Sequence, residues 1–266
     1  MFEAIDTLAN YWEKRAVRFA RERDGLAAVC SYGMPQFYNR VIEICQRRAL
    51  RPWLRCIREQ DVLEVGCGVG RWTQELAENS NRVSAFDLSP TMIAATRQRL
   101  DSLDLDADLQ VADVASFQSD RQFDAIVSVT VIQHVTDESE FSQVFERLAN
   151  LVRPGGKAIL LEAAPSNDNE RCDSPIFRAR PLNAYKTLFE ENGFRIDEIS
   201  GVDPMPFKTW LLPHLRSMPR PLADIAANIA AAVSLPLDLL CARWMTKRSW
   251  HKVIVATRAG VPCAKT

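Results

Sequence analysis

Residues 61–70 have the strongest pattern for chemistry in this chain. They read DVLEVGCGVG, a short apolar strand that contains Glu64 and continues into Gly66, Gly68 and Gly70. Glycine permits a tight turn and lets a ligand approach bare backbone. A helix that begins directly afterwards points its first amide groups at that ligand. The segment therefore predicts a binding loop for a nucleotide-like molecule.

The glycine spacing separates two kinds of nucleotide-like ligand. Loops that bind dinucleotides have the spacing G-x-G-x-x-G, whose third glycine lets the helix pack close to the pyrophosphate. Here the spacing is G-x-G-x-G, and Arg71 occupies the position of that third glycine. The segment instead resembles the E/D-x-G-x-G-x-G loop of class I S-adenosylmethionine-dependent methyltransferases. The resemblance extends over roughly residues 55–200.

The resemblance implies a set of cofactor-binding residues at the ends of successive strands. Asp87, in the segment FDLS, corresponds to the acid that binds both ribose hydroxyls, and a carboxylate offers two acceptor oxygens for a diol. Asp113 and Val114 correspond to the pair beside the adenine. The implied residues that bind S-adenosyl-L-methionine, and its product S-adenosyl-L-homocysteine, are Glu64, Gly66, Cys67, Gly68, Gly70, Asp87, Leu88, Asp113, Val114, Thr130 and Gln133.

Two later segments extend the same resemblance. The fourth strand is expected to begin at Phe123-Asp124 and to end near the sulfonium at residues 130–135, TVIQHV. The fifth strand is expected after the Pro154-Gly155 turn. Asp124 opens its strand at the end of the sheet away from these ligand contacts, so we expect a structural role for it.

His134 is the candidate catalytic base. It follows the fourth strand, and ligands of open parallel sheets bind at the carboxyl ends of strands. An ordinary histidine pKa of about 6.5 suits proton transfer near neutral pH. The alternative is that His134 only shapes the pocket. Further candidates for the acceptor pocket are Tyr11, Tyr32, Tyr38 and Glu162. Arg178 and Arg180 could bind an acidic group, and Trp72 could cover the cofactor pocket. The alternatives are packing roles for the aromatic residues and surface positions for the arginines.

Strand-like and helix-like segments alternate along the middle of the chain. Apolar runs predict strands at 61–65, 82–86, 109–112, 124–131, 157–163, 194–200 and 251–258. Helices are predicted at about 70–79, 90–102, 138–151 and 181–192. Such alternation is typical of an α/β fold with a parallel sheet. With the resemblance, we expect a Rossmann-like three-layer sandwich whose mostly parallel seven-stranded sheet has an antiparallel last strand.

The chain divides into a predicted core and additions to it. We expect a helical cap at 1–54, the cofactor-binding core at 55–200 with its last strand at 251–258, and a tail at 259–266. Residues 201–250 are expected to be a mostly helical insertion. It could serve as a lid, a homodimer interface, a membrane-surface patch or additional core packing. Pro236 should split its apolar run, 222–242, into two helices.

Composition narrows the function further. The net charge of −1 disfavours a nucleic-acid partner, and seven scattered cysteines with three histidines form no metal pattern and favour the cytoplasm. We expect a methyltransferase that modifies O, N or C of a small-molecule or amphiphilic acceptor, as a monomer or homodimer with peripheral membrane contact left open. The alternatives are an NAD(P)-dependent oxidoreductase on the same fold and a non-catalytic methyltransferase-like subunit.

Overall fold

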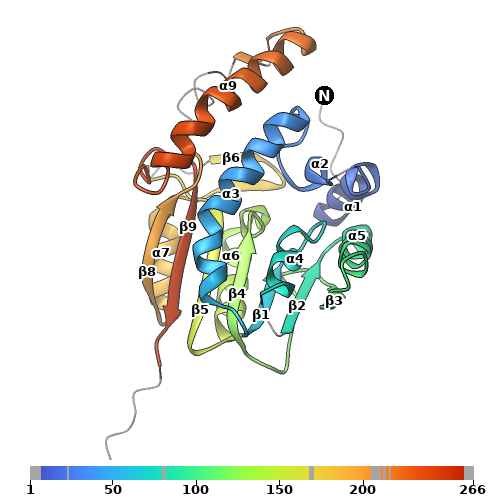
Figure 1. The fold of residues 1–266 in the computed structure, drawn as a ribbon. Coiled ribbons are helices and arrows are strands. Elements are labelled where there is room, and N and C mark those ends of the chain that lie inside the picture. The colour runs from blue at the N-terminus through green and yellow to red at the C-terminus, as the bar shows by residue number, and fades with distance from the viewer. Residues whose placement is uncertain are drawn as a thin grey trace, which may run out of the picture.

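The computed structural model describes residues 7–260 except 23, 80–81, 168–170, 205–210, 212–213 and 216. A seven-stranded sheet with the strand order β3-β2-β1-β4-β5-β9-β8 forms its centre (Figure 1). The strands are β1 (Asp61–Val65), β2 (Arg82–Asp87), β3 (Asp108–Val111), β4 (Phe123–Val129), β5 (Val152–Ala163), β8 (Phe194–Gly201) and β9 (His251–Arg258). The pairs among β1 to β5 are parallel, whereas β9 runs antiparallel to both β5 and β8. This arrangement confirms the predicted sheet.

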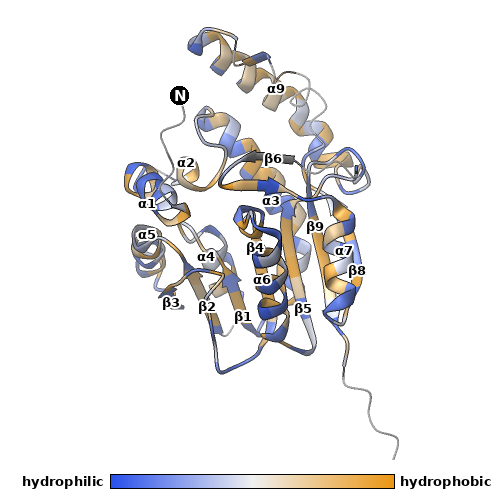
Figure 2. Ribbon diagram, turned by 180° about the vertical axis from the view of Figure 1, so that it is seen from behind, coloured by the Kyte–Doolittle hydropathy of each residue, from blue (hydrophilic) through white to orange (hydrophobic). Residues whose placement is uncertain are grey.

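Helices cover both faces of the sheet. They are α1 (Leu8–Phe19), α2 (Leu26–Val29), α3 (Gln36–Cys56), α4 (Arg71–Ala77), α5 (Pro90–Asp101), α6 (Glu138–Asn150), α7 (Leu182–Glu191) and α9 (Arg220–Cys241). Side chains of α3 and α4 pack in one cluster with Val62 of β1, whereas side chains of α6 and α7 pack in another with the neighbouring Leu63. Successive strand residues therefore face opposite layers. Figure 2 shows the resulting hydrophobic strands between helices with hydrophilic outer surfaces.

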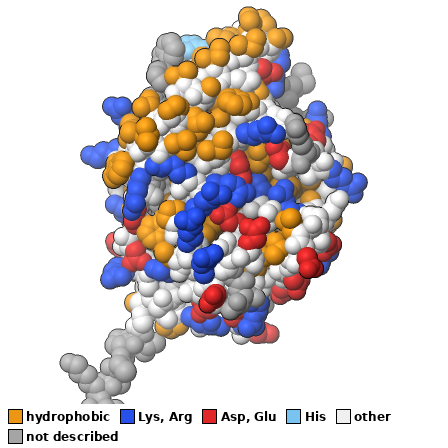
Figure 3. All heavy atoms as spheres, in the orientation of Figure 1, with side chains coloured by type: hydrophobic (Ala, Val, Ile, Leu, Met, Phe, Trp, Pro, Cys, Tyr) orange, Lys and Arg blue, Asp and Glu red, His pale blue; other side chains and the backbone are white. Residues whose placement is uncertain are grey.

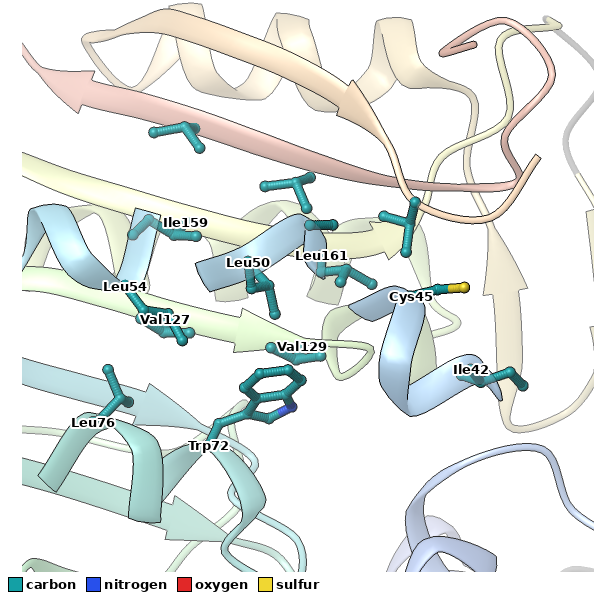
Figure 4. Close-up of a cluster of buried hydrophobic side chains, with 14 of the residues drawn as sticks. Ile42, Cys45, Leu50, Leu54, Trp72, Leu76, Val127, Val129, Ile159 and Leu161 are labelled. Atoms are coloured by element: carbon teal, nitrogen blue, oxygen red, sulfur yellow. The ribbon is translucent and has the colours of Figure 1, made fainter. Parts of the chain in front are cut away.

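The core on one face of the sheet joins the N-terminal helices to the strands. Leu50 and Leu54 of α3 lie in one buried cluster with Trp72 of α4 and with Val127 and Val129 of β4 (Figure 4). Helix α3 thus forms part of the covering layer. The boundary predicted at residue 54 falls inside this helix, which ends at Cys56.

Two segments differ from the strand predictions. Strand β4 ends at Val129, because Thr130 has a left-handed backbone (φ 58°) and a 3-10 turn follows at Ile132–His134. No strand is predicted between residues 163 and 194, but the segment after β5 contains a hairpin of β6 (Arg171–Ser174) and β7 (Phe177–Ala179). These strands are too short to leave a periodic signal in the sequence.

The insertion before β9 contains one continuous helix, α9, so the predicted break at Pro236 is wrong. The proline is exposed, and the residues on either side of it, Ser234 and Asp238, stay buried against the rest of the fold. Packing of that inner face outweighs the lost backbone hydrogen bond. Helix α9 is also long and apolar enough to cross a membrane by length and composition.

The continuous helix predicts the effect of removing its proline. Pro236→Ala restores a helix amide and should raise the free energy of unfolding by about 1–3 kcal/mol. Pro221→Ala is the matched control, because Pro221 lies in the first turn of α9, where proline is tolerated, and it should bring no gain. Thermal unfolding followed by circular dichroism measures both. A lower melting temperature in Pro236→Ala would mean that the helix is broken there.

Candidate active site

A cleft lies at the carboxyl ends of β1, β2 and β4, where ligands bind in open α/β sheets. It encloses about 810 Å³ including its open mouth. The lining residues are Leu8, Trp12, Val29, Gly66, Cys67, Gly68, Arg71, Trp72, Phe86, Asp87, Leu88, Met92, Ala112, Asp113, Val114, Val129, Thr130, Val131, His134 and Val135.

The glycine loop after β1 forms the floor of the cleft. Gly66 and Gly68 have φ angles of 67° and 57°, a conformation that favours glycine. A Cβ at Gly66 would lie 2.5 Å from a Val131 methyl group, and one at Gly68 would lie 2.7 Å from a Val29 methyl group. Bare backbone is therefore required at both positions, and it faces the cleft.

Asp87 is fixed beside this loop at the end of β2. Its Oδ2 accepts a hydrogen bond from the Gly68 amide, and its Oδ1 accepts one from the Ser89 amide, both at 2.9 Å. Burial raises the pKa of Asp87 above its usual range, although these amides favour the charged form. Each carboxylate oxygen has a second lone pair. The side chain can therefore accept two further hydrogen bonds from a ligand diol.

Asp113 and Val114 form the cleft wall beyond β3. The Asp113 carboxylate accepts a hydrogen bond from the Ala115 amide at 2.9 Å, which forms a local turn. Both residues line the cleft, next to Ala112. A polar acceptor and a short apolar wall suit a flat heterocycle with an exocyclic amine.

Glu162 holds the loop that follows β4. This fully buried carboxylate accepts hydrogen bonds from the Val131, Ile132 and Gln133 amides at 3.0–3.3 Å and from the Ser128 hydroxyl at 3.0 Å. Burial raises its pKa to about 7 against the effect of these donors. Glu162 does not line the cleft. It is a positioning residue for the loop, which corrects the hypothesis that it contributes to an acceptor pocket.

His134 lies at the end of that loop in a defined state. Its Nδ1 is 2.5 Å from the Ile176 carbonyl oxygen. Its ring packs edge-on against the Trp12 ring, with 4.8 Å between the ring centroids. A carbonyl only accepts, so Nδ1 carries the proton and Nε2 is an acceptor in the neutral ring. Burial lowers the pKa of His134 to about 4, opposed by the Ile176 carbonyl. The ring is therefore neutral at physiological pH.

Two buried polar atoms near the cleft have no hydrogen-bond partner among the described residues. They are Oε2 of Glu64, which is 2% exposed, and Nε1 of Trp72, which is 3% exposed. Burial raises the pKa of Glu64 to about 8, with the Thr73 hydroxyl opposing the shift and the Asp87 charge adding to it. One acceptor and one donor are thus left for groups that the protein does not supply.

Comparison with known proteins agrees with this geometry. Residues 62–156 match the model of a family described as "Methyltransferase domain". Nodulation protein S of Rhizobium tropici is 32% identical over 107 residues, which are 40% of this chain and 44% of that protein. A ubiquinone biosynthesis O-methyltransferase of Nitrobacter winogradskyi is 26% identical over 172 residues, covering 58% and 64% of the two chains.

The fold has solved counterparts as well. Magnesium protoporphyrin IX methyltransferase from Synechocystis, solved with S-adenosylhomocysteine bound, superimposes with a TM-score of 0.63 at 14% identity, covering 95% of this chain and 98% of that one. The chain resembles a methyltransferase domain over residues 62–156 and shares the fold of solved methyltransferases. It spans about half the length of the curated relatives it matches, 44% and 49% for the two nodulation proteins.

The fold brings most of the predicted site residues to one cleft. Those that line it are Gly66, Cys67, Gly68, Asp87, Leu88, Asp113, Val114, Thr130 and His134. Glu64, Gly70 and Gln133 do not line it. Gly70 precedes α4 and packs against Thr96 of α5, and the Gln133 side chain accepts a hydrogen bond from the Ala163 amide at 3.0 Å. These last two serve the fold around the cleft.

The N-terminal helices supply cleft residues that the sequence did not reveal. Leu8 and Trp12 of α1 and Val29 of α2 line the cleft, whereas the predicted Tyr11 does not. The apolar stripe of α1 indicated a helix face without showing what that face would contact. Tyr32 is exposed and Tyr38 is buried in the core.

Arg178 and Arg180, considered as anion ligands, are both paired within the protein. Their guanidinium groups lie 3.2 Å and 2.8 Å from the Glu138 carboxylate. Arg71, which replaces the third glycine of the dinucleotide pattern, forms an ion pair with Glu43 of α3. None of the three is available as an unpaired cation.

The raised pKa of Glu64 predicts a pH effect on stability. The native pKa of about 8 exceeds the usual value of 4.5, so the native state binds more protons than the unfolded state between these limits. Stability contributed by this group is therefore present below pH 4.5 and is lost as the pH rises through 8. Glu64→Gln cannot ionise and should melt about 2–4 °C above the wild type at high pH, a difference of about 1 kcal/mol.

Thermal unfolding of both proteins across this pH range measures the effect. The two melting curves should converge toward the acid end of the range. Glu146→Gln, at an exposed carboxylate on α6, is the matched control and should show no such pH-dependent gain. A constant difference between wild type and Glu64→Gln at all pH values would contradict the buried titration.

The surroundings of His134 predict its NMR titration. The ring should stay neutral with its proton on Nδ1 down to about pH 5, one unit above its pKa of about 4. The chain has three histidines, so ¹⁵N-detected ring spectra are readily assigned with His134→Gln. Titration near the ordinary value of 6.5, or a proton on Nε2, would show that the contact with Ile176 is not formed.

Proposed function

We propose that this protein transfers a methyl group from S-adenosylmethionine to an oxygen, nitrogen or carbon atom of a small or amphiphilic molecule. The observation that carries the proposal is the convergence of Gly68, Asp87, Asp113 and Thr130 on one cleft. These residues lie on four separate strand ends, and each matches the position that the methyltransferase resemblance assigns to the cofactor.

The residues present fit this cofactor. The bare backbone of Gly66 and Gly68 leaves room for close approach, and the Asp87 carboxylate suits the ribose hydroxyls. Asp113 and Val114 would hold the adenine. The unpartnered Glu64 oxygen and Trp72 indole amine leave one acceptor and one donor for polar contacts near the loop. When bound, S-adenosylmethionine supplies an activated methyl group on a sulfonium.

The protein's own contribution to this chemistry is placement and exclusion of water. In-line displacement needs the acceptor atom about 3–3.5 Å from the methyl carbon and aligned with the bond that breaks. Thr130 and His134, held by the Glu162 carboxylate through the loop amides, form the cleft wall after β4. The neutral His134 ring can accept a hydrogen bond from an acceptor hydroxyl at Nε2. Its low pKa makes it a weak base, so we assign it orientation more than proton removal.

The cleft walls favour an acceptor with apolar surface. Leu8, Trp12 and Val29 close the side formed by the N-terminal helices, and no basic surface suited to a nucleic acid is implied by a net charge of −1. The relatives named above include an O-methyltransferase of ubiquinone biosynthesis, which supports a small-molecule acceptor. Five of the cysteines are free thiols, which supports action in the cytoplasm.

Calorimetric titration of the purified chain tests the proposal. S-Adenosylmethionine and S-adenosylhomocysteine should bind, and Asp87→Ala should weaken binding by about 10–100-fold, because two hydrogen bonds to a charged group are lost. Asp137→Ala is the matched control, since Asp137 only caps α6 and does not line the cleft. It should bind as the wild type does.

Asp87→Asn and thermal unfolding separate a binding defect from misfolding. Asparagine keeps the size and one acceptor, so this variant should fold and bind with intermediate affinity. Absence of binding to either sulfur ligand, or preference for NADH, would reject the proposal in favour of a dinucleotide enzyme. Binding without turnover over a broad panel of acceptors would support a non-catalytic subunit.

A further inference from the structure

Helix α9 presents an apolar stripe to solvent. Between residues 221 and 240 every exposed residue of this helix is apolar. The large members of the stripe are Leu222, Ile225, Ile229, Val233, Leu237 and Leu240, and Trp244 extends it beyond the helix. At 100° per residue they cover an arc of roughly 120°, wider than a coiled-coil seam. Figure 3 shows these hydrophobic side chains gathered over α9 at the top of the molecule.

The opposite face of α9 fixes the helix to the protein. Its buried residues are small or polar, including Ala227, Ala231 and Asp238, and the two alanines belong to the same core cluster as α3. Arg220 at its N-terminal end donates a hydrogen bond to the Gly33 carbonyl in the loop before α3. A helix held along one side cannot cross a bilayer without leaving α3. The stripe is therefore suited to lying in the plane of a membrane surface.

Basic and aromatic side chains follow the stripe at its C-terminal end. Trp244 is 77% exposed, and Lys247 and Arg248 are exposed and form no ion pair with the described residues. No acidic residue occurs between 239 and 250. Tryptophan and cations beside an apolar face are the side chains that favour the boundary of an anionic bilayer.

The charges near the stripe favour a membrane over a second copy of the chain as the partner that covers it. Along the stripe the one partly exposed acid is Asp224, which already pairs with Arg220 at 3.1 Å. Two stripes packed together would therefore leave Lys247 and Arg248 without counter-charges. Anionic lipid headgroups supply those counter-charges.

We propose that the α9 stripe docks this protein on anionic membrane surfaces. Helix α9 lies at the end of the molecule toward which the parallel strands point (Figure 1). The cleft lies at the carboxyl ends of these strands, so docking places it near the lipid interface. A solute that partitions into that interface would reach the cleft from the membrane side. Vesicle binding needs neither cofactor nor acceptor, so it is measured independently of methyl transfer.

Co-sedimentation of the full chain with vesicles tests the docking. Vesicles of equal parts phosphatidylcholine and phosphatidylglycerol should bind the protein, and Ile229→Glu/Val233→Glu should weaken binding by about tenfold or more. The matched control is Leu103→Glu/Val111→Glu, which places the same charges at exposed apolar positions away from α9 and should bind less than threefold more weakly than the wild type. Lys247→Gln/Arg248→Gln should reduce binding to these vesicles but not to pure phosphatidylcholine.

Three outcomes would overturn the proposal. The first is no binding to anionic vesicles at low salt, and the second is binding that survives Ile229→Glu/Val233→Glu. The third is a dimer in sedimentation velocity that this double variant converts to a monomer, because a second copy would then cover the stripe. All substituted residues are exposed, and unchanged melting temperatures would confirm that each variant is folded.

Discussion

The backbone of the glycine loop is the constraint on which the site depends. Val131 from the loop after β4 and Val29 from α2 each approach a glycine so closely that no Cβ would fit. Thr96 of α5 approaches Gly70 in the same way. One short turn after β1 thus meets three elements that are distant in sequence. The same closely packed loop lines the cleft with Gly66, Cys67 and Gly68, so it can contact a ligand and also hold the surrounding elements together.

Three carboxylates, of which Glu64 and Glu162 are buried and Asp87 is half-buried, have different roles around that loop. Asp87 and Glu162 both accept backbone amide hydrogen bonds, but Asp87 lines the cleft whereas Glu162 holds the loop from behind. Glu64 has an oxygen without a hydrogen-bond partner among the described residues, and its pKa of about 8 is higher than the value of about 7 for Glu162. Burying a charged oxygen without a hydrogen-bond partner costs free energy. A ligand group that supplies a donor or a positive charge to this Glu64 oxygen should therefore gain more binding free energy than it would beside a solvated acid.

The sequence predicted the parts of the fold and site that are encoded locally. The buried strands, the glycine loop, Asp87 and Asp113 follow from short apolar runs and from the residues directly after them. The positions of Trp12 and Glu162 could not be predicted, because each depends on contacts with segments 29 or more residues away, His134 and residues 131–133. The prediction of a helix break at Pro236 was wrong for a related reason. Local propensity predicts a break, whereas packing of the inner face of α9 keeps the helix continuous.

The two faces of α9 differ in the size of their side chains. The inner face uses alanine and serine, which allow close approach to the core but bury little apolar area. Most of the larger apolar side chains, such as Ile225, Ile229 and Leu240, point outward, whereas Leu235 packs partly against the core. Burying such a side chain is worth about 1.5–3 kcal/mol, so the isolated chain leaves this stabilisation unused. If α9 served only to complete the core, the large residues would be expected on its inner face. Their outward placement is explained when the stripe has its own apolar surroundings, and a bilayer interface supplies these together with anions for Lys247 and Arg248.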